Sequence, residues 1–206
     1  MRPTLLCASL LCLLFSITGC NRPAATPPIS DWMALPAFTE QGINVVVEIP
    51  AGTNLKLEYD EEQKSFEPVW RDGRERRIDF LPYPANYGFI PSTYMAPAQG
   101  GDGDALDVLL LCSSLPTGTV VEALPIAALL LLDEGEIDTK IIAVPLDSSL
   151  QVIKARNFVE FSMAYDGARH IIESWFLHYE GLGVNEFRGW RDENFAREEI
   201  RRWLRQ

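Results

Sequence analysis

Two kinds of apolar patterning divide the chain and restrict the folds open to it. In the first two thirds, short apolar and β-branched runs alternate with clusters of Gly, Pro and Asp, as in strands joined by turns. These runs are 44–49, 55–59, 108–112, 120–132 and 140–144. In the last third, 168–179 and 194–204 space their apolar residues as amphipathic helices do, while 157–165 fits neither pattern clearly. The sequence predicts a small β-barrel with helices packed outside it.

The beginning of the chain has the layout of a secretory signal peptide. Arg2 supplies a positive charge, an apolar run covers 5–17, and the small residues Thr18 and Gly19 precede Cys20. The run is too short to cross a bilayer comfortably, since that takes about 20 apolar residues. We therefore predict that residues 1–19 are a signal peptide and that the remainder of the chain is exported.

Cys20 is a candidate for lipid attachment. The segment 17–20 resembles the lipobox of bacterial lipoproteins, whose cysteine becomes the lipid-bearing first residue of the mature chain. A Pro-rich stretch follows, so we predict that 20–36 form an anchor and tether and that 37–206 form the functional domain. The domain would then be membrane-anchored at the cell envelope, facing the periplasm or the exterior. The alternative is a plain secreted protein with an incidental cysteine.

Charge and cysteine content exclude two further features. The net charge is −11, whereas a nucleic-acid surface needs clustered Lys and Arg, so we expect no nucleic-acid partner. After Cys7, Cys12 and Cys20 are set aside, Cys112 is the one cysteine left in the domain, so we expect no intrachain disulfide. The segment 37–206 shows no internal repeat or second linker and suits a single domain.

The segment 101–108 places three carboxylates, Asp102, Asp104 and Asp107, at the start of an apolar run. Carboxylates this close repel one another, and a hard divalent cation with several oxygen ligands relieves the repulsion. An EF-hand loop is excluded by spacing, because its Gly and Glu positions, counted from Asp102, are occupied by Asp107 and Ser113. A solvated acidic turn is the alternative to a metal site.

Charged residues in other segments are expected to meet these three aspartates. Asp138 and Lys140 are two apart and so face the same side of a strand, as do Lys56 and Glu58. Glu48 ends another apolar run. Carboxylates on the inner face of short strands are costly unless they are paired or bound to metal. Acidic residues from four segments could therefore converge at one mouth of the barrel.

The segment 102–108 resembles the signature of family I soluble inorganic pyrophosphatases, Asp-x-Asp-[Pro/Glu]-apolar-Asp-apolar, and departs from it only at Ala105. Further motifs of that family stand in the expected order at 47–50, 56–58, 83–88, 133–140, 143–145 and 178–179. The resemblance covers roughly 43–190. It implies an α+β domain with a mainly β core, an OB-like small closed β-barrel with flanking C-terminal helices.

The resemblance also implies an activity, the Mg²⁺-dependent hydrolysis of pyrophosphate to two phosphates by direct attack of a metal-activated water. Asp104 would be the general base. The metal-binding residues would be Asp102, Asp107, Asp133 and Asp138, with Glu48 and Glu58 holding metal-bound waters. The substrate-binding residues would be Lys56, Arg76, Tyr83, Tyr87, Lys140 and Tyr179, with Arg76 chosen from the group 74–77. Packing at the barrel rim is the alternative role for Tyr83 and Tyr87.

The charges of these residues fit the same chemistry. Seven candidate carboxylates and three candidate cations leave about −4, and fully ionised pyrophosphate adds about −4. About four divalent ions would neutralise the total, so we expect roughly three to four Mg²⁺ ions together with substrate.

One departure from the family pattern leaves a rival open. The family normally places a phosphate-binding lysine after the helix tyrosine, whereas Glu180 follows Tyr179 here. Arg188, a few residues further on, could fold back and neutralise it, or could leave it uncompensated. The rival is a catalytically weak, metal- or phosphate-binding surface lipoprotein on a pyrophosphatase scaffold. A general two-metal phosphoesterase is a second rival. Bacterial relatives are often hexamers, so a homo-oligomer is possible.

Overall fold

The computed structural model describes residues 29–133 and 135–205. The predicted signal peptide, Cys20 and the first part of the predicted tether lie outside these residues. The described strands are β1 (Ile43–Ile49), β2 (Leu57–Asp60), β3 (Ser65–Pro68), β4 (Trp70–Arg71), β5 (Arg74–Glu75), β6 (Asn86–Phe89), β7 (Asp107–Leu110), β8 (Val120–Asp133), β9 (Glu136–Pro145) and β10 (Asn185–Asp192). The helices are the short 3₁₀ helix η1 (Pro97–Gln99), α1 (Phe158–Ala164), α2 (Asp166–His178) and α3 (Glu193–Arg202).

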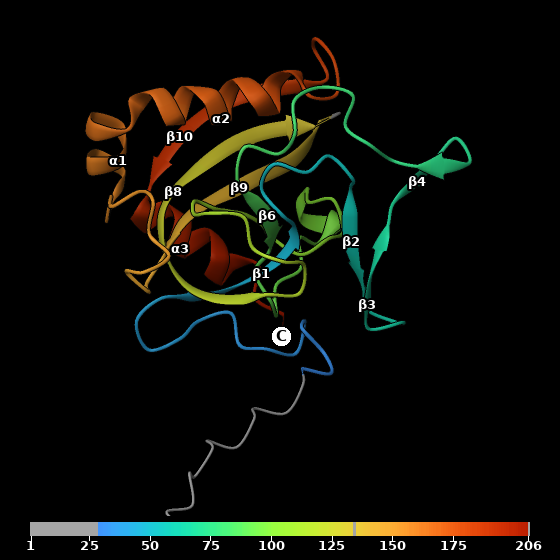
Figure 1. Ribbon diagram of the computed structural model, residues 1–206, viewed down its shortest axis with the longest axis horizontal. Helices are drawn as coiled ribbons and strands as arrows, with labels where there is room; N and C mark the ends of the chain where they lie inside the picture. Colours follow the sequence, from blue (N-terminus) through green and yellow to red (C-terminus); the bar gives the residue numbers. More distant parts are fainter. Residues whose placement is uncertain (1–28, 134, 206) are drawn as a thin grey trace, which may run out of the picture.

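Five strands close into a ring, which confirms the predicted OB-like barrel. The strands follow one another as β1, β6, β7, β9 and β8, and β8 returns to pair with β1 between Ile43 and Ala123. The β7–β9 pairing is parallel, and the other four are antiparallel. A closed ring leaves fewer exposed strand edges than an open sheet of the same size. Figure 1 shows the long strands β8 and β9 curving across the molecule.

β8 is long enough to pair with β1 along its first part and with β10 along its last part. Its register with β9 shifts between Pro125 and Ala127, as at a β-bulge. Pro has no N–H to donate and is tolerated at such an irregularity. Before the shift β8 pairs with β1, and after it β8 pairs with β10. The strand β10 was not predicted from sequence, and it adds a sixth strand beside the ring.

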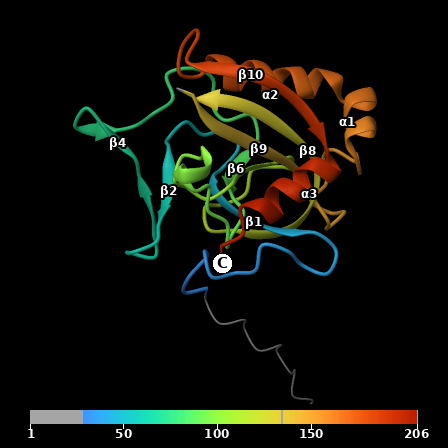
Figure 2. The same ribbon diagram turned by 180° about the vertical axis from the view of Figure 1, so that it is seen from behind.

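Helices cover the barrel on two sides and confirm the predicted helical last third. From α2, Trp175 and Phe176 pack in a buried cluster with Leu129 of β8. From α3, Ile200 packs in a second cluster with Val45 of β1. Figures 1 and 2 show α1 at one end of α2 and α3 apart from both against the sheet. Within the described ranges, no helix combines the length and apolar composition needed to cross a membrane.

The ambiguous segment 157–165 forms α1. The Asn157 side chain caps this helix by accepting a hydrogen bond from the Glu160 backbone N–H at 2.8 Å. Asp192 caps α3 in the same way through the backbone N–H of Phe195, at 3.0 Å. Such caps satisfy N–H groups that have no partner inside the helix.

Residues just before the barrel, placed by the sequence in the tether, pack onto it. The Trp32 indole N–H donates to the Gly118 carbonyl at 2.8 Å, and its ring meets Tyr59 and Phe66 edge-on, with centroids 5.7 and 5.1 Å away. Met33 is buried with Val46 and Phe89. The packed part of the described chain therefore includes Trp32 and Met33, upstream of the predicted domain start at 37.

Candidate active site

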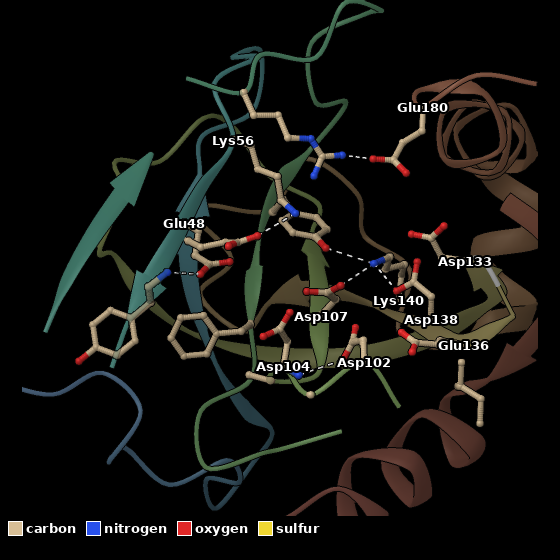
Figure 3. A pocket seen from close by; sticks show the side chains of 18 of the residues that line it. Glu48, Lys56, Asp102, Asp104, Asp107, Asp133, Glu136, Asp138, Lys140 and Glu180 are labelled. Carbon is tan, nitrogen blue, oxygen red and sulfur yellow. Dashed lines mark hydrogen bonds and ion pairs between the residues drawn. The ribbon is translucent and has the colours of Figure 1, made fainter. Parts of the chain in front are cut away.

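A cavity of about 370 Å³ opens between the barrel, the β2–β3 hairpin and the end of α2 (Figure 3). Among the described residues, ten carboxylates line it, namely Glu48, Glu58, Glu61, Asp102, Asp104, Asp107, Asp133, Glu136, Asp138 and Glu180. Four cations join them, namely Lys56, Arg71, Arg76 and Lys140. With every group ionised, the lining carries a net charge of −6, which is costly without bound cations.

The acidic loop is held in shape by its backbone. Met95 exchanges hydrogen bonds with it, donating to the Asp104 carbonyl at 2.7 Å and accepting from the Gly103 N–H at 2.8 Å. A Cβ on Gly101 would lie 2.5 Å from the Met95 carbonyl oxygen, so a larger residue does not fit there. Gly103 has φ +92°, a conformation that glycine adopts without strain. The two glycines thus let the loop turn its carboxylates into the cavity.

The acidic end of the cavity is formed by Asp102, Asp104, Asp107, Asp133, Glu136 and Asp138. Lys140 lies at its centre. Its ammonium forms ion pairs with both Asp107 and Asp138 and donates to the Tyr87 hydroxyl at 3.2 Å. Burial opposes its charge, but the two carboxylates together raise the pKa of Lys140 well above its ordinary value. One ammonium cannot neutralise two carboxylates. Burial, together with Asp107, accordingly raises the pKa of Asp138 although Lys140 lowers it.

The remaining carboxylates also have too little positive charge nearby to offset their own negative charge. Burial, reinforced by the charges of Asp102 and Glu58, raises the pKa of Asp104 to about 6. Burial likewise raises the pKa of Asp102 and, more strongly, that of Glu48. Glu48 is held toward β2, because its Oε1 accepts from the Tyr59 backbone N–H at 2.8 Å.

This acidic end fits a hard divalent cation by the chemistry of its donors. Among the described residues, no three His, Cys, Asp or Glu side chains are gathered closely enough to hold a metal ion as they stand. The Lys140 ammonium lies where Asp107 and Asp138 converge. Asp133, however, has a buried Oδ1 with no hydrogen-bond partner in the described structure. Oxygen donors in excess, one of them unsatisfied, are the ligands that Mg²⁺ and Ca²⁺ prefer.

The opposite wall carries three of the four cations, Lys56, Arg71 and Arg76, each of them near a glutamate. The Lys56 N–H donates to the Arg76 carbonyl at 3.0 Å, so the two residues lie on neighbouring backbone segments. The Lys56 ammonium pairs with Glu58 at 2.7 Å, as the predicted shared face requires. Tyr179 caps the end of α2 with its ring stacked on Trp175, at 4.6 Å between centroids and 6° between planes. An acidic end and a wall of paired lysine, arginine and glutamate side chains thus face each other across one cavity.

The structure brings together most of the residues singled out in the sequence. Of the predicted base, metal and substrate residues, the cavity is lined by Asp104, Asp102, Asp107, Asp133, Asp138, Glu48, Glu58, Lys56, Arg76, Tyr87, Lys140 and Tyr179. Tyr83 lies behind this wall, 4% exposed and packed against Tyr87 and Trp175. Arg76 lines this cavity, whereas Arg74 and Arg77 line a neighbouring one.

Several lining residues were missed. Glu136 belongs to the second acidic segment and could have been included with it. Arg71 precedes the Asp72-Gly73 turn and enters the cavity because the β4–β5 hairpin folds back. Of the two cases left open for Arg188, the structure supports the one in which it does not neutralise Glu180, since this arginine pairs with Glu186 at 2.6 Å, within the exposed part of β10. Glu180 is instead paired with Arg76.

Known proteins are similar to this chain in sequence and fold. Residues 45–206 match the family model described as inorganic pyrophosphatase. The inorganic pyrophosphatase of Saccharolobus solfataricus is 38% identical over 164 residues, covering 78% of this chain and 88% of that protein. That of Neisseria meningitidis serogroup A is 37% identical over 175 residues, covering 80% and 90%. The crystal structure of inorganic pyrophosphatase from Thermus thermophilus matches with a TM-score of 0.71 at 29% identity, covering 84% and 97%. This chain belongs to the inorganic pyrophosphatase family.

Proposed function

We propose that this chain is an inorganic pyrophosphatase that hydrolyses pyrophosphate to two phosphates by direct attack of a water activated by Mg²⁺. The observation that carries the proposal is that an acidic end and a wall bearing lysine and arginine side chains meet in one cavity of about 370 Å³. A phosphoric anhydride bears charge on both of its ends, and cations from the protein and from solution must offset it for an anionic nucleophile to approach.

Each lining residue has a part in this chemistry. Asp102, Asp107, Asp133 and Asp138 would hold Mg²⁺, with Glu48 and Glu58 oriented toward its waters. When bound, the ions would acidify the attacking water and neutralise phosphate charge. Asp104 would accept the proton of that water, and its pKa of about 6 leaves it ionised at neutral pH. Lys56, Arg76, Tyr87, Lys140 and Tyr179 would bind phosphate oxygens.

The test is phosphate release from pyrophosphate by the purified chain without residues 1–19. We expect turnover that requires Mg²⁺ and is abolished by EDTA. Parallel assays with phosphate monoesters separate a pyrophosphatase from a general two-metal phosphoesterase. Binding of Mg²⁺ and pyrophosphate without turnover would support the rival, a catalytically weak binding lipoprotein.

We propose further that the enzyme is exported and anchored to a membrane by lipid at Cys20. The support is the sequence of 1–28 alone, with its signal-like run, lipobox-like segment and Pro-rich tether. A single acyl chain binds a membrane only marginally, so a stable anchor requires several chains on this residue. Cys20→Ser should move the protein from the membrane fraction to the soluble fraction or block signal processing. Normal processing with membrane retention would refute lipidation.

A homo-oligomer is also proposed. Its support is apolar surface on the outer helices, where Met163 of α1 and Ile171 of α2 are 82% and 61% exposed. Sedimentation of the signal-free chain would show a mass above that of one copy if the proposal holds.

A further inference from the structure

Glu180 and Arg76 form an ion pair inside the cavity wall, although they lie 104 residues apart in sequence. Glu180 follows α2 by two residues, and Arg76 follows β5 directly. Both side chains are mostly buried, 13% and 12% exposed. Figure 3 shows Glu180 facing a guanidinium across the upper part of the cavity. A pair so placed is shielded from solvent, so its energy is not screened away as it is at an open surface.

The pair separates two cavities. Arg71, Arg76, Tyr179 and Glu180 line both the site described above and a neighbouring cavity of about 690 Å³ beneath the β4–β5 hairpin. Arg71 also reaches toward Glu180, at 3.9 Å, but its side chain is 61% exposed. The Glu180 carboxylate is therefore the shared partner of two arginines that face the substrate side of the site.

Carboxylate and phosphate compete for the same group. A guanidinium binds either through parallel N–H···O bonds, and the planar arrangement of its donors suits both. A phosphate that takes hold of Arg76 must displace Glu180 or share the guanidinium with it. Sharing places two anions side by side in a poorly solvated pocket, which is unfavourable.

We propose that Glu180 is a positioning residue that restrains Arg76 and weakens the binding of phosphate groups by competing for its guanidinium. This inference rests on the proposed function. Its consequence is a site that holds pyrophosphate less tightly than it would with Arg76 unrestrained, and that lets product phosphate leave more readily.

The first experiment measures binding separately from turnover. Calorimetry with inorganic phosphate and with the non-hydrolysable analogue methylenediphosphonate, each with Mg²⁺, would compare the parent chain with Glu180→Gln. Loss of the competing charge should tighten binding about three- to tenfold, because this mostly buried pair contributes more than an exposed pair does. KM for pyrophosphate should fall by a similar factor.

A matched control removes the same charge elsewhere. Glu186 pairs with Arg188 on β10, is 64% exposed and does not line the cavity. Glu186→Gln should change ligand affinity less than twofold, since exposed ion pairs contribute little. Equal tightening by both variants would overturn the proposal in favour of a net-charge effect. Should Glu180→Gln fail to fold, Glu180→Asp, which keeps the charge on a shorter stem, should give a smaller increase in affinity, and no increase would overturn the proposal.

A double-mutant cycle then tests the route through Arg76. In a background with both Arg71→Gln and Arg76→Gln, the two guanidinium partners of Glu180 are gone, so adding Glu180→Gln should improve binding by much less than it does in the parent. The same improvement in both backgrounds would show that Glu180 repels phosphate directly and would overturn the restraint. Absence of turnover in the parent would contradict the proposed function instead. The double-mutant cycle, which measures binding alone, would still decide the role of Glu180.

Discussion

The backbone N–H of Asp104 donates to Oδ1 of Asp102 at 3.0 Å, so two carboxylates of the cavity share one turn. The turn holds the Asp102 charge beside Asp104, in a place where burial already penalises ionisation. The predicted base thus starts, without metal, from a pKa of about 6 in place of its ordinary 3.8.

This shift predicts how metal-free stability depends on pH. Because the folded pKa of Asp104 exceeds the unfolded one, the folded state binds more protons between about pH 4 and pH 6. The contribution of Asp104 to the free energy of unfolding is therefore present below pH 4 and is lost as pH rises through about 6.

Urea unfolding in EDTA, for the parent and for Asp104→Asn, isolates this contribution. The parent's free energy of unfolding minus that of the variant should fall from pH 4 to pH 7. Mg²⁺ should reverse the fall, because bound cations stabilise the ionised carboxylates. A difference that is constant over this range would show that Asp104 titrates normally.

Replacing single carboxylates with amides should distinguish the general base from the metal ligands. Asp104→Asn should lower kcat by about 10²- to 10⁴-fold with a small effect on Mg²⁺ affinity, as loss of a general base does. Asp107→Asn should mainly weaken Mg²⁺ activation, because Asp107 is assigned to the metals and its charge faces Lys140. Steady-state kinetics over a Mg²⁺ titration would show both effects. Near-normal kcat in Asp104→Asn would remove it from the role of base.

The identity of the metal should matter for turnover more than for binding. The cavity offers oxygen donors, which both Mg²⁺ and Ca²⁺ accept, but Mg²⁺ requires stricter geometry and shorter distances. We expect Ca²⁺ to bind, measured by calorimetry, and to support little phosphate release. Equal turnover with the two ions would contradict the mechanism.

The barrel was predictable where local patterning agrees with the final packing. The apolar runs of β1, β8 and β9 lie in strands that are mostly buried, so their composition reflects their environment. In contrast, β10 is mostly exposed and polar, and its pairing with the edge of β8 holds it in place. That pairing is a long-range contact, which residue composition within Asn185–Asp192 does not encode.

The same distinction applies to the site. Asp102, Asp104 and Asp107 lie within six residues, so their proximity is visible in the sequence. The partner of Glu180 cannot be identified from the sequence in this way. Arg188 is near Glu180 in sequence, but it belongs to β10, where it pairs with Glu186. Arg76 reaches Glu180 only after the hairpin and the end of α2 have come together.

The packing of Trp32 predicts that residues upstream of the family-matched region stabilise the active-site wall. Asp31 accepts from the Tyr59 hydroxyl at 3.1 Å and pairs with Lys64 at 2.6 Å, so the segment is fastened to β2 and to the turn after it.

Trp32→Ala would remove a half-buried indole, its hydrogen bond to Gly118 and its edge contacts with Tyr59, the residue that also holds Glu48. Loss of that packing should lower the free energy of unfolding by about 2–4 kcal/mol, near the lower end for large aromatic truncations. Trp70→Ala is the matched control, because Trp70 is 66% exposed and its loss should cost less than about 0.5 kcal/mol. Urea unfolding of both variants measures these costs.

KM for pyrophosphate should also rise in Trp32→Ala, because β2 carries Glu58 and directly follows Lys56. Equal stability of the two variants would mean that the segment around Trp32 contacts the barrel without stabilising it. The position of β2 would then depend on Glu48 and not on Trp32.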